Sequence, residues 1–236
     1  MDNKSFSPKA LIRLAMILLD APLTLYIGYK IGGEHYYILS LTVLVWAMLP
    51  FFLMFEKRRP KANELVVLAV MCAVAVVSRA AFVWLPHFKP ITAVIIIAGA
   101  AFGAEAGFMV GAVSMLASNF IFGQGMWTPW QMFAFGIAGF LSGVVFCGGR
   151  IKPDKWKLAV FGGFTVMLIV GPLLDTCTLF IMASEISKSA AAAVYLAGLP
   201  VNAIHAAATV LTLLFASEPF LEKLNRVKIK YGMMEA

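Results

Sequence analysis

The sequence predicts an all-α protein that crosses a membrane several times. Of its 236 residues, 61% are hydrophobic and 13% are charged. Its apolar runs are long enough to cross a hydrocarbon core of roughly 30 Å, which takes about 20 helical residues. Its basic residues gather at alternate ends of these runs, as in other multi-pass membrane proteins.

Eight apolar segments define the expected helices. A basic N-terminus precedes the first segment, as in a signal peptide, but Asp20 and Pro22 stand where a cleavage site needs small residues. We therefore expect the first segment to be retained as a helix. The segments span about residues 10–28, 36–55, 64–85, 91–104, 106–122, 130–147, 157–182 and 191–216.

The distribution of Lys and Arg predicts the orientation of the chain. Basic loops stay in the cytoplasm, so we expect both termini to be cytoplasmic in a multi-pass protein of the cell membrane. The net charge of +7 then follows from topology, and no nucleic-acid partner is expected. Lys30, Lys89 and Lys188 are the basic residues at the opposite, outer ends. The residues at the cytoplasmic ends are Lys4, Lys9, Arg13, Lys57, Arg58, Arg59, Lys61, Arg150, Lys152, Lys155, Lys157, Lys223, Arg226, Lys228 and Lys230.

A basic break after Phe55 divides the chain into unequal parts. Beyond it, glycines recur at every fourth position from Gly99 to Gly111. On a helix they form one stripe, along which two backbones can approach closely. The expected parts are a two-helix transmembrane hairpin (1–56), a basic cytoplasmic linker (57–63), a six-helix core (64–220) and a basic cytoplasmic tail (221–236).

A polar and aromatic loop between two apolar segments is the main candidate for a binding site. Residues 118–132 read Ser-Asn-Phe-Ile-Phe-Gly-Gln-Gly-Met-Trp-Thr-Pro-Trp-Gln-Met. Unpaired backbone groups cannot face lipid, so this loop must lie at a membrane surface or line a cavity. Tryptophans alone are typical of an interfacial belt, but the Gly-Gln-Gly before Trp127 and the Thr-Pro between the two tryptophans are not. The hydrogen-bonding and aromatic candidates for ligand contact are Asn119, Gln124, Trp127, Thr128, Trp130 and Gln131.

Further polar residues are expected inside the membrane. Arg79 and Asp175 lie at similar depth in the outer half, so they can form an ion pair or contact the ligand. The alternative for Arg79 is to extend outward to the lipid headgroups. Asn202 and His205 share one helix face. Asn202 is a candidate for ligand contact, and we expect His205 to satisfy a core hydrogen bond rather than to bind a metal.

Other chemistry is not indicated by the sequence. Cys72, Cys147 and Cys177 are isolated in apolar sequence, which gives neither a disulfide framework nor a metal-ligand spacing. The chain has no phosphate-binding Gly-x-x-x-x-Gly-Lys-Ser/Thr sequence. Any ATP-driven work is therefore expected to be done by a partner, and no intrinsic cofactor, metal site or catalytic residue is predicted.

Residues 64–220 resemble the substrate-binding (S) component of an energy-coupling factor (ECF) transporter. The resemblance implies a six-helix S-component bundle, preceded here by the additional hairpin, that captures a vitamin at its outer face. It also implies a membrane scaffold subunit and two ATPase subunits as partners. The family's Ala-x-x-x-Ala contact motif matches Ala69 and Ala73. The resemblance rests on the first core helix from Glu64 to Ala75, the short helix from Ile91 to Gly103, the glycine stripe, and the loop 118–132 followed by Gly136, Gly139 and Gly143.

The loop 118–132 is similar to that of members assigned to cobalamin, so cobalamin or a related corrinoid is the first expectation for the substrate. Riboflavin, another vitamin or a corrinoid precursor are the alternatives. An ion-coupled secondary transporter is an alternative class, with Arg79, Asp175 or Asp20 as its coupling site.

An intramembrane serine hydrolase is the third class, because Ser142 and His205 resemble a catalytic dyad. However, Phe140 replaces the glycine expected two residues before the nucleophile. We therefore do not expect an enzyme.

Overall fold

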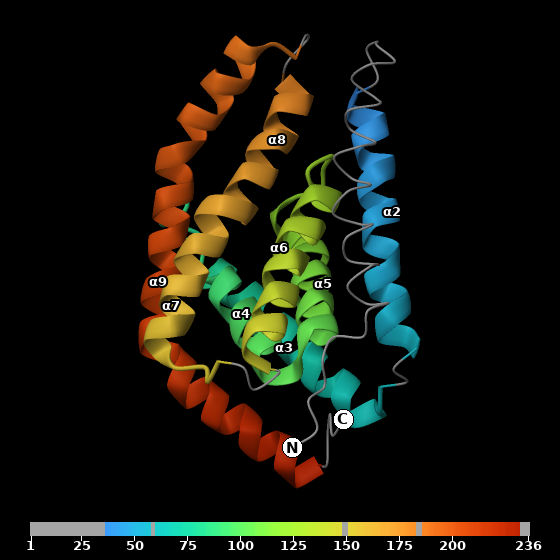
Figure 1. Ribbon diagram of the computed structural model, residues 1–236, viewed down its shortest axis with the longest axis vertical. Coiled ribbons are helices and arrows are strands. Elements are labelled where there is room, and N and C mark those ends of the chain that lie inside the picture. The colour runs from blue at the N-terminus through green and yellow to red at the C-terminus, as the bar shows by residue number, and fades with distance from the viewer. Residues whose placement is uncertain (1–35, 58–59, 148–150, 183–185, 232–236) are drawn as a thin grey trace.

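The computed structural model describes residues 36–57, 60–147, 151–182 and 186–231, and these ranges contain helices and no strands (Figure 1). Six helical spans among them are long and apolar enough to cross a membrane, which agrees with the expected all-α membrane fold. Asp20 and the first expected segment, 10–28, lie outside the described residues. The helices are α2 (Tyr36–Lys57), α3 (Ala62–Ala81), α4 (Ile91–Phe102), α5 (Ala104–Phe122), α6 (Thr128–Ser142), α7 (Lys155–Thr165), α8 (Gly171–Met182) and α9 (Lys188–Tyr231), with π-helical turns at Gly143–Cys147 and Val166–Val170.

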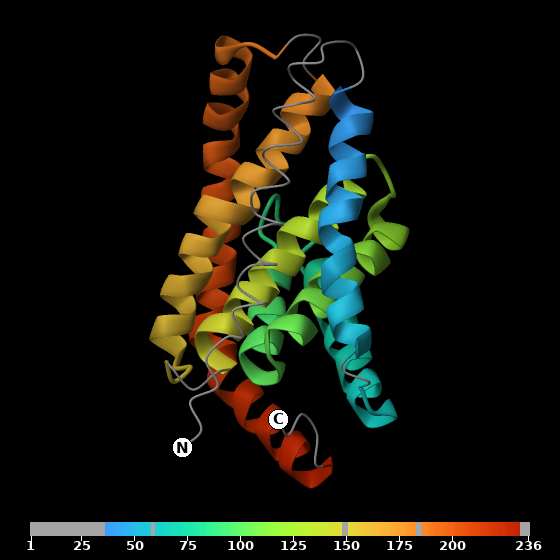
Figure 2. The ribbon, with the colours of Figure 1, turned by 45° about the vertical axis from the view of Figure 1, so that its right-hand side comes forward.

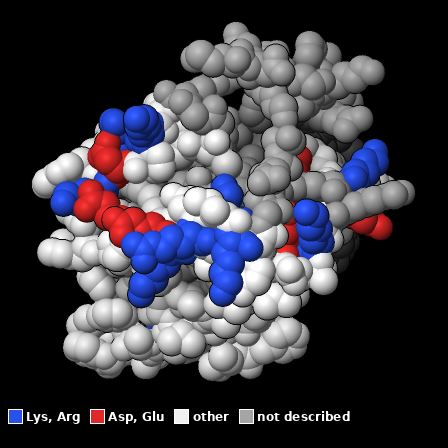
Figure 3. Space-filling model, turned by 90° about the horizontal axis from the view of Figure 1, so that it is seen from below, with Lys and Arg blue, Asp and Glu red and all other residues white. Residues whose placement is uncertain are grey.

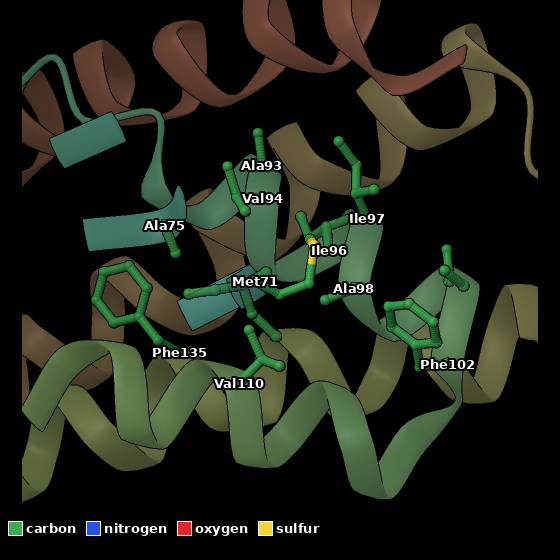
Figure 4. Close-up of a cluster of buried hydrophobic side chains, with 14 of the residues drawn as sticks. Met71, Ala75, Ala93, Val94, Ile96, Ile97, Ala98, Phe102, Val110 and Phe135 are labelled. Carbon is green, nitrogen blue, oxygen red and sulfur yellow. The ribbon is translucent and has the colours of Figure 1, made fainter. Parts of the chain in front are cut away.

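Helix α4 lies at the centre of the bundle. Its 12 residues are all buried, and α3, α5, α6 and α9 pack around it. Figure 4 shows its side chains pointing in several directions, with Met71, Val110 and Phe135 approaching from neighbouring helices. A helix that is apolar all round is stable only when it is surrounded. The Nζ atom of Lys228 donates to the Ala101 carbonyl (2.7 Å) at the C-terminal end of α4, where a cation is favourable.

The expected glycine stripe lets α4, α5 and α6 pack backbone against backbone. A Cβ atom added at Gly99 or Gly107 would collide with the Gly139 carbonyl, and one at Gly111 would collide with the backbone of Phe135. Gly103 separates α4 from α5 with a φ of 97°, a conformation that side chains disfavour. The glycines therefore serve helix packing, as the spacing predicts.

Helix α2, the second helix of the expected hairpin, packs against the core. The ring of Phe51 is 1% exposed. It stacks on Phe108 of α5, with a centroid distance of 4.1 Å, and meets the edge of Phe140 of α6 at 5.1 Å. α2 is therefore part of the helical bundle.

Several helix boundaries differ from the expected ones. α3 ends at Ala81 rather than near 85, because the chain turns repeatedly before Pro90. Helix α9 continues to Tyr231, so much of the expected tail is helical. Leu221 and Leu224 are buried in the core, which explains why the helix persists in a charged segment. Figures 1 and 2 show the last part of α9 turning across the lower end of the bundle.

The segments that carry the described basic clusters lie at one end of the molecule. The end of α2, the start of α7 and the last part of α9 all lie at the lower end in Figures 1 and 2. Figure 3 views the molecule from that side and shows Lys and Arg side chains on this face. The charge distribution is thus consistent with the expected topology.

Candidate functional site

Arg79, near the end of α3, is held by α5. Its Nη1 atom donates to Ser118 Oγ (2.8 Å) and to Asn119 Oδ1 (3.1 Å). The guanidinium also lies over the ring of Phe122, 4.7 Å from its centroid, within the range of a cation–π interaction. Arg79 is therefore fixed inside the bundle and does not depend on an acidic partner.

Asn119 links Arg79 to the loop between α5 and α6. It is 1% exposed, and its Nδ2 atom donates to Thr128 Oγ1 (3.0 Å) and Gln131 Oε1 (2.7 Å). Thr128 Oγ1 donates in turn to Gln124 Oε1 (2.9 Å), while Gln124 Nε2 donates to the Leu116 carbonyl (3.2 Å). Much of the polar chemistry of this loop is thus used to fix its own shape and to orient Gln131.

Asp175 on α8 is paired with Asn202 on α9. Asn202 Nδ2 donates to Asp175 Oδ2 (2.8 Å). Two glycines make room for this pair, because a Cβ atom at Gly198 would collide with the carboxylate and one at Gly171 would collide with the amide. The ion pairs among the described residues do not include one between Arg79 and Asp175. Each of the two has other partners, so the hypothesised direct pair is not formed.

His205 makes the core hydrogen bond expected of it. Its Nε2 atom lies 2.8 Å from Thr92 Oγ1, at the start of α4. The imidazole also lies against the ring of Phe135, with centroids 5.8 Å apart. These contacts place the imidazole where α4, α6 and α9 meet.

Four of the predicted residues line one cavity of about 180 Å³, here called the main cavity. Helices α3, α6, α8 and α9 each contribute one of them. Apolar side chains from α4, α5, α6, α8 and α9 complete the wall. The predicted residues are Arg79, Gln131, Asp175 and Asn202; the other lining residues are His87, Lys89, Ile91, Met115, Phe135, Leu174, Thr178, Val201 and His205.

A second hollow of about 300 Å³ adjoins the main cavity between α6 and α8. The two share Gln131, Leu174 and Thr178 as lining residues. Trp127 lines the second hollow and is 43% exposed, so one of its faces is accessible to a ligand. The main cavity is thus lined by charged groups, and the hollow that adjoins it is lined mainly by apolar side chains.

Trp130 lies elsewhere. It lines neither hollow and is 1% exposed. Its ring packs 5.8 Å from that of Phe180 within the cluster that contains Phe51. Trp127 precedes α6, whereas Trp130 lies within its first turn, and the helix turns Trp130 toward the core. Trp130 is therefore positioned to stabilise the fold rather than to cover a ligand.

His87 and Lys89 belong to the main cavity although the sequence did not single them out. Both lie in the turns between α3 and α4, and His87 has a φ of 61°, which is uncommon for a non-glycine residue. Burial and the nearby Arg79 guanidinium lower the pKa of Lys89. One signal was available in the sequence, because Lys89 is basic on the side where basic residues are scarce.

A family model described as "ECF-type riboflavin transporter, S component" matches residues 60–218, which is more than half of the chain. The chain belongs to this family. No curated protein and no solved structure gave a match. The S component is thus a multi-pass protein of the cell membrane and a subunit of an ECF importer, with an ECF scaffold, ATPase subunits and a vitamin as its partners.

The S component is not an enzyme, and its geometry agrees with this. Ser142 Oγ donates to the Ile96 carbonyl (2.7 Å), while His205 Nε2 is bonded to Thr92. Ser142 and His205 therefore do not form the hydrogen bond that a catalytic dyad requires.

Proposed function

We propose that this S component captures its vitamin in the main cavity and the adjoining second hollow. The observation that carries the proposal is the convergence of Arg79, Lys89, Asp175 and Asn202 on one cavity of an otherwise apolar bundle. Ionisable groups at membrane depth are costly and commonly mark a substrate site. Apolar walls with a few converging polar groups are also typical of small-molecule sites.

The cavity is proposed to open outward. The described basic clusters lie at the lower end of the molecule in Figures 1 and 2, which is assigned to the cytoplasm because basic loops are retained there. Both termini are then cytoplasmic. Capture occurs from outside, and the scaffold and two ATPase subunits reorient the loaded S component to release the vitamin inward. ATP is used by these partners, and the S component needs no cofactor of its own.

Riboflavin, or a vitamin of similar size, is the proposed substrate. The description of the matching family supports it, and so do the two hollows of about 180 and 300 Å³, since sites for drug-sized ligands measure about 300–1,000 Å³. Phe135 and Leu174 offer apolar surface for a planar ring, while Asp175 and Asn202 offer an acceptor and an amide for its polar edge. A corrinoid is much larger than a flavin, and no feature of the two hollows favours it.

The exposed face of α3 is the proposed contact with the scaffold. Ala69 and Ala73 lie one turn apart and are exposed. Large apolar side chains flank them, including Val66 and Val70, which are 62% and 54% exposed. Small residues let two membrane helices approach closely, and this strip offers such a surface.

Uptake by the reconstituted importer tests the proposal. Proteoliposomes containing the S component, scaffold and ATPases are expected to accumulate labelled riboflavin when ATP is supplied on the side of the membrane that the ATPases face. A non-hydrolysable ATP analogue should not support this uptake. Unlabelled cobalamin in excess should not compete. Uptake driven by an ion gradient without the ATPases would favour a secondary transporter, and uptake of cobalamin alone would favour the corrinoid assignment.

A further inference from the structure

Lys89 is partly buried, and no hydrogen bond or ion pair to a described residue holds its ammonium group. It differs in this from the other lysines whose surroundings the structure describes. Lys155 pairs with Glu218, and Lys157 pairs with Asp154. Lys228 binds the Ala101 carbonyl. In the part of the chain that the structure describes, Lys89 has no hydrogen bond or ion pair, although it lines the main cavity.

A second cation adjoins Lys89 and makes this arrangement more costly. The guanidinium of Arg79 lines the same cavity. Burial lowers the pKa of Lys89, and repulsion by this guanidinium lowers it further. Burying an ammonium without a counter-charge is unfavourable, and a like charge beside it adds to the cost. The main cavity therefore holds two neighbouring cations, neither of which forms an ion pair with a described residue.

The acidic side of the cavity does not balance these charges. Asp175 is the carboxylate that lines it, and its Oδ2 atom already accepts from Asn202. His87 and His205 are the other titratable groups of the lining. Arg79, Lys89 and Asp175 together give the lining a net positive charge.

The geometry of Arg79 leaves room for an anionic ligand. Both of its hydrogen bonds to protein leave from Nη1, and no described residue bonds its other two nitrogens. A guanidinium prefers to bind carboxylate or phosphate through two parallel hydrogen bonds. Since α5 already fixes the side chain, binding such a group needs little further ordering.

We propose that the molecule captured by this S component carries an oxyanion group, a carboxylate or a phosphate, which binds between Arg79 and Lys89. The inference rests on the proposed function in one respect, namely that the main cavity is the vitamin site. Within the flavin class it predicts that the phosphate ester binds more tightly than free riboflavin. The rest of the ligand extends between Phe135 and Leu174 toward the second hollow.

Matched ligand pairs test the proposal with the purified S component. Each pair differs in the anionic group: riboflavin 5′-phosphate with riboflavin, biotin with biotinamide, and pantothenate with pantothenol. In at least one pair, the anionic member should bind tenfold or more tightly than the neutral one, as measured by calorimetry. A phosphate preference and a carboxylate preference appear in different pairs, so the two oxyanions are distinguished.

Variants of Lys89 identify the group responsible for the preference. Lys89→Gln should remove most of the difference within the pair, and Lys89→Arg should retain it. Lys188→Gln is the matched control, because Lys188 is an exposed lysine at the start of α9 and should leave both affinities unchanged. The melting temperature of each variant reports whether the fold is intact.

Three results would overturn the proposal: equal binding of both members of every pair that binds, equal loss of both affinities in Lys89→Gln, or binding of no member of any pair. Failure of the proposed function has a different signature. ATP-dependent uptake of riboflavin without preference for an anion would overturn only the oxyanion site. Tight binding of an anionic ligand without ATP-dependent uptake would overturn only the transport assignment.

Discussion

The two tryptophans of the predicted loop 118–132 should respond in opposite ways to truncation. Trp130 is 1% exposed and packs against Phe180 in the cluster shared by α2, α6 and α8. Trp130→Ala removes this packing and leaves a cavity, which should cost about 3 kcal/mol of unfolding free energy. This is the low end of the usual range, because burial between membrane helices gains little from the hydrophobic effect. Ligand affinity of the folded fraction should stay within about threefold, or roughly 0.65 kcal/mol.

Trp127 provides the matched comparison. It lines the second hollow and is 43% exposed, so its removal leaves the core intact. Trp127→Ala should lower ligand affinity by about tenfold, equivalent to about 1.4 kcal/mol, with little change in the melting temperature. Thermal unfolding in detergent and calorimetric titration below the unfolding transition separate the two effects.

The reverse pattern would place Trp130 in the ligand site. Trp130→Ala would then weaken ligand binding tenfold without lowering the melting temperature. Trp130→Phe is a useful control, because it keeps an aromatic ring in the cluster and should recover much of the lost stability.

Three further predictions concern packing, partner contact and charge. Gly139→Ala should lower the unfolding free energy by about 1–3 kcal/mol, because the added Cβ atom would collide with a backbone carbonyl of α5. Gly163→Ala is the control, because its Cβ atom would meet only a side chain, at 3.1 Å. It should cost less stability when both variants are measured by thermal unfolding. Replacing Ala69 and Ala73 together by Leu should abolish ATP-dependent uptake while the isolated S component still binds its vitamin, and loss of binding as well would contradict a purely partner-facing role. Burial and Arg79 lower the pKa of Lys89, so Lys89 should lose its proton at a lower pH than an exposed lysine does. Affinity for an anionic ligand should fall over that alkaline pH range. Lys89→Arg should move that loss to higher pH in the same titration, and an unchanged profile would count against a charged Lys89.

Features with a strong local signal were predictable from the sequence. The glycine spacing predicted close helix packing, and the structure shows Gly99, Gly107 and Gly139 in backbone contact. Arg79, Asp175 and Asn202 were chosen because polar groups inside a membrane need partners or a cavity, and Gln131 because it belongs to the polar loop 118–132. All four line one cavity. In each case, the physical requirement is local and independent of how distant segments meet.

Features that depend on tertiary contacts were less predictable. Nothing in the sequence around Asn119 shows that its side chain hydrogen-bonds with Arg79, Thr128 and Gln131. The sequence therefore predicted that Asn119 contacts the ligand. The direction in which the Trp130 side chain points depends on the residue at which α6 begins. Lys89 lies next to Arg79 because the chain turns immediately after α3, whereas the sequence indicated a longer helix.

Similar reasoning applies to the last helix. The charges after Glu218 are typical of a tail, but Leu221 and Leu224 recur on one face and pack against the core. Recognising that face requires knowing that α4 ends nearby, where Lys228 binds the Ala101 carbonyl. The sequence contains the pattern, but its partner surface forms only in the folded bundle.

Blocking the main cavity is the most direct test of the proposal that a vitamin binds there. Thr178 lines both hollows, so Thr178→Trp should fill their junction. Titration with riboflavin and riboflavin 5′-phosphate should show saturable binding to the unmodified S component and an affinity at least a hundredfold lower for Thr178→Trp. Leu196→Trp, on a 66% exposed position of α9, should bind as the unmodified protein does. Undiminished binding by a folded Thr178→Trp variant would place the vitamin site elsewhere and contradict the account.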